Sequence, residues 1–275
     1  PEIHDGRMYG RGTLDMKSFA AVAFNSMFHV LENRLPLKFG IILSSDEEKG
    51  SKGTEAFMEA HKEMKAAIVL DNDVGGNILS IVNKCKNPVF VKIIAEGKEA
   101  HGSTPWDGID LVPYPYFSKE KKMPKDTWID TVHFAKIEGG QVSNVISNYA
   151  EALLDFRLTE NSTVEHLEEN LNKCMESGVT YKIVSSSTPV VMDPDNKYIQ
   201  AYKKLAEEVL GEKMFFEQIG GATDSRAFAV RGSTVIMNSG TGEGMHANGE
   251  YVEIDSVKKL AQIQTKFLDK LALEK

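Results

Sequence analysis

GRGTLDMKSFAAVAFNSMFHVL, residues 10–31, joins a glycine-containing turn to a segment with helical periodicity. The apolar residues of this segment recur at the spacing of a helix with one buried face: Met16, Phe19, Ala20, Ala23, Phe24, Met27, Phe28 and Leu31. Short apolar runs at residues 37–45 and 66–70 predict buried strands, and residues 51–64 between them predict a second helix. A helix between buried strands, repeated, predicts an α/β fold in which a mainly parallel sheet has helices on both faces.

The pattern changes near Asn83. Alternating segments at 88–96, 129–137 and 151–158, a helical segment at 164–175 and a strand at 179–185 predict a smaller α+β unit of ferredoxin-like type. After Pro189 the first pattern returns, with helices expected at 198–210, near 223–230 and at 255–271, and strands at 214–219 and 234–237. We therefore predict a discontinuous α/β domain, residues 1–83 and 189–275, interrupted by an inserted domain, residues 84–188.

Composition excludes several classes of protein. The 275 residues carry a net charge of −8, which argues against a nucleic-acid or anionic-membrane partner, because phosphate-rich surfaces attract basic faces. No apolar run approaches the roughly 18 residues of a membrane span, and we see no signal peptide. Cys85 and Cys174 lie far apart without a CxxC arrangement, which indicates a reducing compartment and predicts a cytoplasmic location.

Acidic residues gather where strands are predicted to end. Glu47 and Glu48 follow the strand at 37–45, Asp71 follows the strand at 66–70, and Asp15 opens the first helix. His246 lies in a glycine-rich loop, residues 240–246, after a later strand. Ligands of open α/β sheets bind beyond the carboxyl ends of the strands. Carboxylates with one imidazole suit zinc or a similar divalent ion.

The adjacent pair Glu47 and Glu48 suggests two separate roles. One carboxylate can bind the metal while its neighbour takes a proton from metal-bound water. Taken singly, however, acidic residues in a loop are usually part of a solvated surface turn, and a lone histidine is usually an ordinary polar residue.

Seven short motifs extend the argument over nearly the whole chain. They are GRGTLDMK at 10–17, SDEEKGS at 45–51, AHGSTPW at 100–106, GGQVSNVI at 139–146, DFR at 155–157, GATD at 221–224 and HANGE at 246–250. In this order they resemble the dinuclear metallopeptidase family of acetylornithine deacetylase, succinyl-diaminopimelate desuccinylase, aminoacylase and peptidase T.

The resemblance implies a role for each matching residue. Asp15 would bridge two metal ions, Glu48 and His246 would complete one site, and Asp71, with Asp73 as its rival, would bind the other ion. Glu47 would be the general base. The metals would be Zn²⁺, two per subunit, with Co²⁺ or Mn²⁺ as alternatives.

The inserted domain would pair two subunits as a homodimer. His101 of that domain would reach the neighbouring active site and stabilise the oxyanion. Arg157 would grip a substrate carboxylate together with Asn144. Gly220, Gly221 and Thr223 would shape the substrate pocket.

Two features depart from the family pattern. The family carries a His-x-Asp motif, whose histidine is a metal ligand, well upstream of the bridging aspartate, whereas here only 14 residues precede Asp15. His4 has the wrong spacing to replace it, so we expect an N-terminally truncated chain that binds at most one metal tightly. Pro113, Pro115 and Pro124 also interrupt a segment, 109–127, that helps relatives dimerise.

The sequence thus predicts metal-dependent hydrolysis of an amide bond in a small carboxylate-bearing substrate, an N-acyl amino acid or a short peptide. The alternative is a non-catalytic protein that binds a small acid or a single metal, which follows if the native gene lacks the His-x-Asp motif. A glycoside hydrolase with paired carboxylates would leave His246 unexplained.

Overall fold

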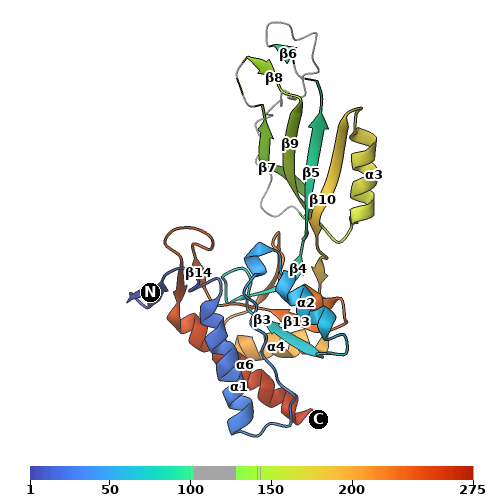
Figure 1. The fold of residues 1–275 in the computed structure, drawn as a ribbon. Coiled ribbons are helices and arrows are strands. Elements are labelled where there is room, and N and C mark those ends of the chain that lie inside the picture. Colours follow the sequence, from blue (N-terminus) through green and yellow to red (C-terminus); the bar gives the residue numbers. More distant parts are fainter. Residues whose placement is uncertain (99, 102–127, 141, 143, 275) are drawn as a thin grey trace. The chain divides into compact units, whose positions relative to one another are not determined.

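The computed structural model describes residues 1–98, 100–101, 128–140, 142 and 144–274, so the proline-containing segment 109–127 lies outside the described residues. The chain divides into two compact units, which are described separately (Figure 1). The first unit comprises Pro1–Cys85, Val190–Ile219 and Thr223–Lys275. The second comprises Lys86–Pro189 and Gly220–Ala222.

A five-stranded sheet forms the centre of the first unit. Its strands are β3 (Ile68–Asp71), β4 (Ser80–Cys85), β11 (Val190–Val191), β12 (Phe215–Ile219) and β13 (Thr234–Met237). The pairs β13–β3 and β12–β4 are parallel, as expected for an α/β fold, but β4 runs antiparallel to β13 and to β11. The sheet is therefore mixed, because the link between β3 and β4, residues 72–79, is too short for the crossover that a parallel return requires.

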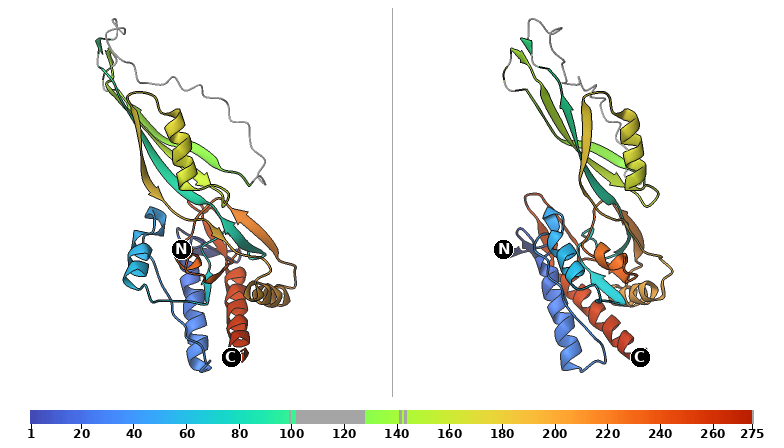
Figure 2. Two further views of the ribbon diagram at one scale, coloured as in Figure 1. Left: turned by 90° about the vertical axis from the view of Figure 1, so that its right-hand side faces the viewer. Right: turned by 45° about the vertical axis from the view of Figure 1, so that its right-hand side comes forward.

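Helices cover both faces of this sheet, as predicted. On one face lie α1 (Lys17–Glu32), α4 (Lys197–Leu210) and α6 (Ile254–Leu273), with α1 and α6 side by side (Figures 1 and 2). Their shared core includes Phe19, Ile81, Tyr202, Ile236 and Ile263. On the other face, α5 (Arg226–Ala229) contributes Ala229 to a second apolar cluster, around Val82, Val235 and Met237. None of the helices in the described part of the chain is long and apolar enough to cross a membrane.

A small antiparallel sheet joins the two ends of the first unit. Its order is β1 (Glu2–His4), β2 (Arg7–Tyr9), β15 (Tyr251–Glu253) and β14 (Gly242–Glu243). Asp5 and Gly6 both have positive φ, 52° and 72°, and form the tight turn between β1 and β2. Because β2 pairs with β15, the loop at 10–15 lies beside the loop at 244–250.

The strand predicted at residues 37–45 is not present. This segment connects α1 to the short 3₁₀ helix η1 (Glu47–Lys49), which precedes α2 (Lys52–Ala60), and it pairs with no strand of the described chain. Ile42 and Leu43 are 43% and 62% exposed. A short apolar run indicates a buried segment, but a strand also needs a neighbour for its backbone hydrogen bonds.

The second unit is a four-stranded antiparallel sheet with one helix on it (Figure 2). The strand order is β10 (Val179–Ser186), β5 (Asn87–Glu96), β9 (Tyr149–Leu158) and β7 (Thr131–Gly139). The helix α3 (Val164–Cys174) begins after Thr163, whose hydroxyl accepts a hydrogen bond from the His166 backbone, and its Leu171 packs on the sheet. A separate pair joins β6 (Ala100–His101) to β8 (Val145–Ile146).

A buried polar chain ties the helices of the first unit to its strand ends. Ser26 of α1 donates to Gln264 of α6, which donates to Asn72 in the loop after β3. Asn72 in turn donates to the carbonyl of Asn238 at 2.6 Å. The Asn238 amide donates to two carbonyls of the 78–80 turn and accepts from the Tyr202 hydroxyl at 3.0 Å. Since these side chains are buried, every lost bond would leave a polar group unpaired.

We expect Tyr202→Phe to lower the free energy of unfolding by about 1–2 kcal/mol, because the side-chain oxygen of Asn238 would be left buried without this donor. Tyr198→Phe, on the same helix but partly exposed, is the matched control and should change the stability by less than about 0.5 kcal/mol. Urea denaturation measures both. Equal effects of the two substitutions would show that the polar chain contributes no stability.

Candidate metal centre

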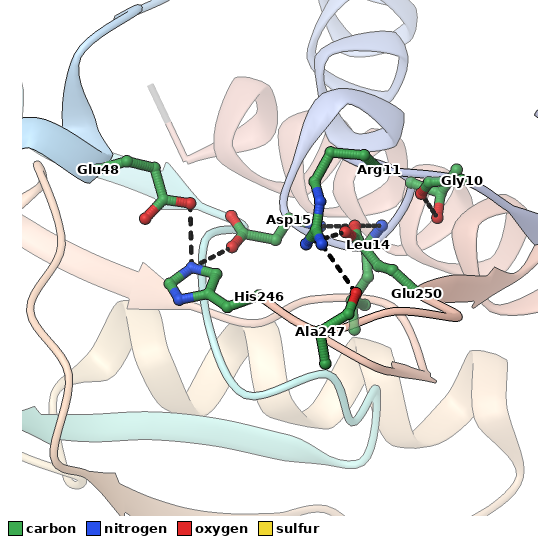
Figure 3. A network of polar contacts seen from close by, with 9 residues as sticks. Gly10, Arg11, Leu14, Asp15, Glu48, His246, Ala247 and Glu250 are labelled. Atoms are coloured by element: carbon green, nitrogen blue, oxygen red, sulfur yellow. Dashed lines mark hydrogen bonds and ion pairs between the residues drawn. The ribbon is translucent and has the colours of Figure 1, made fainter.

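Three side chains from distant parts of the sequence meet at the edge of the first unit. Nε2 of His246 lies 2.8 Å from Oδ2 of Asp15 and 3.0 Å from Oε1 of Glu48 (Figure 3). Asp15 follows the glycine-containing turn, Glu48 belongs to η1, and His246 lies in the loop after β14. Asp15 is largely buried, whereas the side chains of Glu48 and His246 are 57% and 63% exposed.

This donor set fits one divalent cation. One ligand atom from each of the three residues lies within 4.8 Å of the other two. Two carboxylate oxygens and one imidazole nitrogen match the ligand types and the number that catalytic zinc sites use, with one position left for water or substrate. The local backbone holds the imidazole, since His246 adopts a φ of 58° in a turn closed by the Ala247 amide bonding to the Gly244 carbonyl.

The three adjacent acids 46–48 have three different surroundings. Asp46 accepts a hydrogen bond from the Gly53 amide at 2.7 Å, which ties it to the first turn of α2. Glu48 turns toward His246. Glu47 lies near Asp224 and Glu48. The short 3₁₀ turn separates these side chains, which a strand or a longer helix would arrange differently.

The environment of Glu47 favours its protonated form. Burial raises the pKa of Glu47 to about 7, and the negative charges of Asp224 and Glu48 act in the same direction. Arg226 opposes this effect with its positive charge. A carboxyl group with a pKa near 7 can both accept and release a proton at neutral pH.

Asp71 and Asp73 differ in what they contact. One oxygen of Asp71 accepts a hydrogen bond from the Asp73 backbone amide at 2.9 Å, and the other accepts from the Thr223 hydroxyl. The side chain of Asp73 instead lies close to Asp15, which adds to the raised pKa of Asp73. Burial raises the pKa of Asp73, as do the nearby charges of Asp71 and Glu47. Asp73, named as the rival of Asp71, thus lies close to the carboxylate expected to bridge the metals, and the choice of Asp71 as the ligand stays a prediction.

In the second unit, Arg157 is oriented by its own strand. Its Nε and Nη2 donate to the two carboxylate oxygens of Asp155 at 2.8 and 2.9 Å, and Asp155 is buried. Nη1 lies 3.5 Å from the carbonyl of Gly220. The arginine predicted to bind substrate thus lies beside the glycine segment 220–222, which contains the predicted pocket residue Gly221.

The remaining predicted site residues have different positions. Thr223 is buried, and its hydroxyl donates to Asp71 at the end of β3. Asn144 is exposed in the turn before β8. The backbone of His101 lies in β6, and its side chain is outside the described part of the structure.

Sequence reasoning missed several supporting residues. Arg226 donates to the Thr223 carbonyl and lies 3.8 Å from both Glu55 and Asp224. Glu250 accepts hydrogen bonds from the loop that carries Asp15. Asp224 and Glu250 belong to the motifs at 221–224 and 246–250, which could have drawn attention to them. Their roles could not be predicted, because their partners are distant in sequence.

Comparison with known proteins decides the family. Residues 1–270 match the model of peptidase family M20/M25/M40. The chain belongs to this family. Its members are metal-dependent hydrolases of carbon–nitrogen bonds, and this membership does not favour a non-catalytic binding protein.

Among relatives of the M20 chain, an uncharacterized metallohydrolase of Methanocaldococcus jannaschii is 25% identical over 96% of this chain and 73% of its own length. The succinyl-diaminopimelate desuccinylase of Nitrosomonas eutropha is 24% identical over 100% of this chain and 77% of its own length. A tripeptidase from Staphylococcus aureus shares the fold, with a TM-score of 0.82 and 18% identity over 99% of this chain and 76% of that one.

Asp73→Asn should stabilise the metal-free protein at neutral pH, by about 2 °C or more in the unfolding midpoint. A raised pKa means that the folded state loses stability as the pH rises above about 4, the pKa of an unfolded aspartate, so the gain from asparagine should vanish below that pH. Thermal unfolding in chelator across this range measures it. Asp195→Asn, at an exposed position, is the control. A destabilised Asp73→Asn protein would contradict the crowded placement of this carboxylate.

Proposed function

We propose that this M20 chain hydrolyses an amide bond in a small substrate with a free carboxylate, as an N-acyl amino acid deacylase or a dipeptidase. The observation that carries the proposal is the meeting of Asp15, Glu48 and His246 beside Glu47, a partly buried carboxyl group with a pKa near 7. The relationship to a succinyl-diaminopimelate desuccinylase supports an acylated amino acid as the substrate class.

Zn²⁺ is the proposed metal, with Co²⁺ or Mn²⁺ as substitutes. Asp15, Glu48 and His246 would hold one ion. Asp15 and Asp71 would hold a second, with Asp73 as the rival for this role because it lies close to Asp15. Two carboxylates are fewer protein ligands than zinc normally takes, so this second position should be the weaker one.

Glu47 performs the proton transfers in the proposed mechanism. A bound Zn²⁺ lowers the pKa of its water to about 7. Glu47 takes a proton from the attacking water and later delivers it to the leaving amine, which a carboxyl group with a pKa near 7 can do in both directions.

Substrate binding is assigned to the second unit. Arg157 binds the substrate carboxylate with the guanidinium edge that Asp155 leaves free, and Asn144 and Gly221 complete the contact. His101 donates to the developing oxyanion in the active site of a partner subunit, in a homodimer formed through residues 84–188. Two parallel N–H donors match the geometry of a carboxylate, which a lysine cannot reproduce.

Glu47→Gln and Glu48→Gln should separate the two adjacent roles. Glu47→Gln cannot accept a proton, so kcat should fall by about 100-fold or more while metal binding survives. Glu48→Gln loses a ligand charge, so metal affinity should fall by about 10-fold or more. Calorimetric Zn²⁺ titration and turnover measure the two effects. If both variants keep full activity, the assigned roles are wrong.

A screen of N-acyl amino acids and dipeptides, each with its C-terminal amide as a matched pair, tests the substrate class in the presence of Zn²⁺, Co²⁺ or Mn²⁺. Free acids should be hydrolysed and amides should be poor substrates. Arg157→Lys should raise KM for the acids by about 10-fold, since one charge-assisted hydrogen bond is lost. Equal turnover of acid and amide would refute the carboxylate contact, and hydrolysis of neither would favour a binding protein.

A further inference from the structure

Glu250 is a buried carboxylate that belongs to none of the proposed metal or substrate contacts. Its side chain is only 1% exposed, although it lies in the loop that carries His246. Burying a charged carboxylate is costly unless hydrogen bonds and a counter-charge compensate for the lost water. The partners of Glu250 therefore indicate what it does.

One oxygen of Glu250 binds the backbone next to the bridging ligand. Oε1 accepts hydrogen bonds from the Leu14 amide at 2.9 Å and from the Asp15 amide at 3.1 Å (Figure 3). The Gly10 amide donates to the backbone carbonyl of Glu250 at 2.9 Å. Both ends of the turn that presents Asp15 are thus fixed to residue 250.

The other oxygen connects to the histidine ligand through Arg11. Oε2 accepts from Nη1 of Arg11 at 2.9 Å, and Nη2 of the same guanidinium donates to the Ala247 carbonyl at 2.8 Å. Ala247 directly follows His246. The arginine therefore joins the carboxylate to the backbone that carries the imidazole (Figure 3).

The loop itself folds tightly onto Glu250. Gly244 has a φ of +82°, and a Cβ at this position would lie 2.8 Å from the Cα of Glu250. The chain between residues 244 and 250 therefore has little room to shift, so a displacement of Glu250 would move the His246 turn with it.

Only a carboxylate satisfies this arrangement. All the groups that face its two oxygens are donors: the Leu14 and Asp15 amides on one side and the Arg11 guanidinium on the other. A glutamine of the same shape would turn its NH₂ group toward one set of donors and leave that set unpaired. We propose that Glu250 is a positioning residue that sets the spacing of Asp15 and His246 for the metal, with Arg11 as its link to His246.

This inference rests on the proposed metal site, and its test uses binding and backbone dynamics as well as activity. Glu250→Gln should lower Zn²⁺ affinity by about 10- to 100-fold, the range seen when groups that orient metal ligands are lost. In the metal-free protein, the Leu14 and Asp15 amide hydrogens should exchange faster with deuterium, because their acceptor is weakened. Arg11→Gln, at an exposed side chain, should lower the affinity while leaving the exchange at Leu14 and Asp15 unchanged.

Glu253→Gln is the matched control, because it removes the same charge three residues away, in β15, where Glu253 is half-exposed and lies 3.9 Å from Arg7. It should change neither measurement. Unchanged Zn²⁺ affinity in Glu250→Gln and Arg11→Gln would overturn the inference. If the unmodified protein binds no Zn²⁺, the proposed function fails instead, and the exchange rates still decide whether Glu250 holds the Asp15 turn. If Glu250→Gln does not fold, Arg11→Gln alone decides the link to His246.

Discussion

Repulsion between carboxylates is the constraint on which the metal centre depends. Six acidic side chains crowd its surroundings: Asp15, Glu47, Glu48, Asp71, Asp73 and Asp224. His246 and Arg226 are the basic side chains that contact members of this group. Such a cluster is unfavourable in a folded protein unless a cation or protons neutralise it. The surrounding structure must therefore supply the energy that holds these groups together.

That energy comes from buried polar contacts behind the acids. Asn72, between the two aspartates of its loop, is anchored by Gln264 and by the Asn238 carbonyl. The anchor fixes the backbone on both sides, so Asp71 turns to Thr223 while Asp73 turns to Asp15. The uncharged side chain of Asn72 thus holds the backbone that places Asp73 among the other carboxylates. Fully paired buried networks of this kind are rigid, which is what a preorganised metal site requires.

The sequence predicted much of the fold because its periodic segments are long. The spacing of apolar residues at 16–31 predicted a helix that the structure has at Lys17–Glu32, and the strand predicted at 234–237 has the observed bounds. The segment at 37–45 failed because its pattern indicates burial but says nothing about a partner strand. The choice of Asp71 over Asp73 as a metal ligand stays a prediction, since both follow the same strand and only the fold of the loop separates them. Glu250 lies in the motif at 246–250, but its role could not be predicted because its partners Leu14 and Arg11 lie 236 and 239 positions away.

The three ligands of the proposed metal site differ in how firmly the surrounding structure holds them. Asp15 is 12% exposed, and its turn is held by β2, by Glu250 and by the start of α1, whereas Glu48 and His246 are more than half exposed. Glu48 depends on a single 3₁₀ turn, and His246 depends on a loop of positive-φ residues. If a metal bound here, Asp15 would keep its position, and Glu48 and His246 would move to complete the coordination. Because Asp15 also lies close to Asp73, the turn at residues 10–15 would hold the proposed bridging carboxylate in place for a second ion as well as for the first.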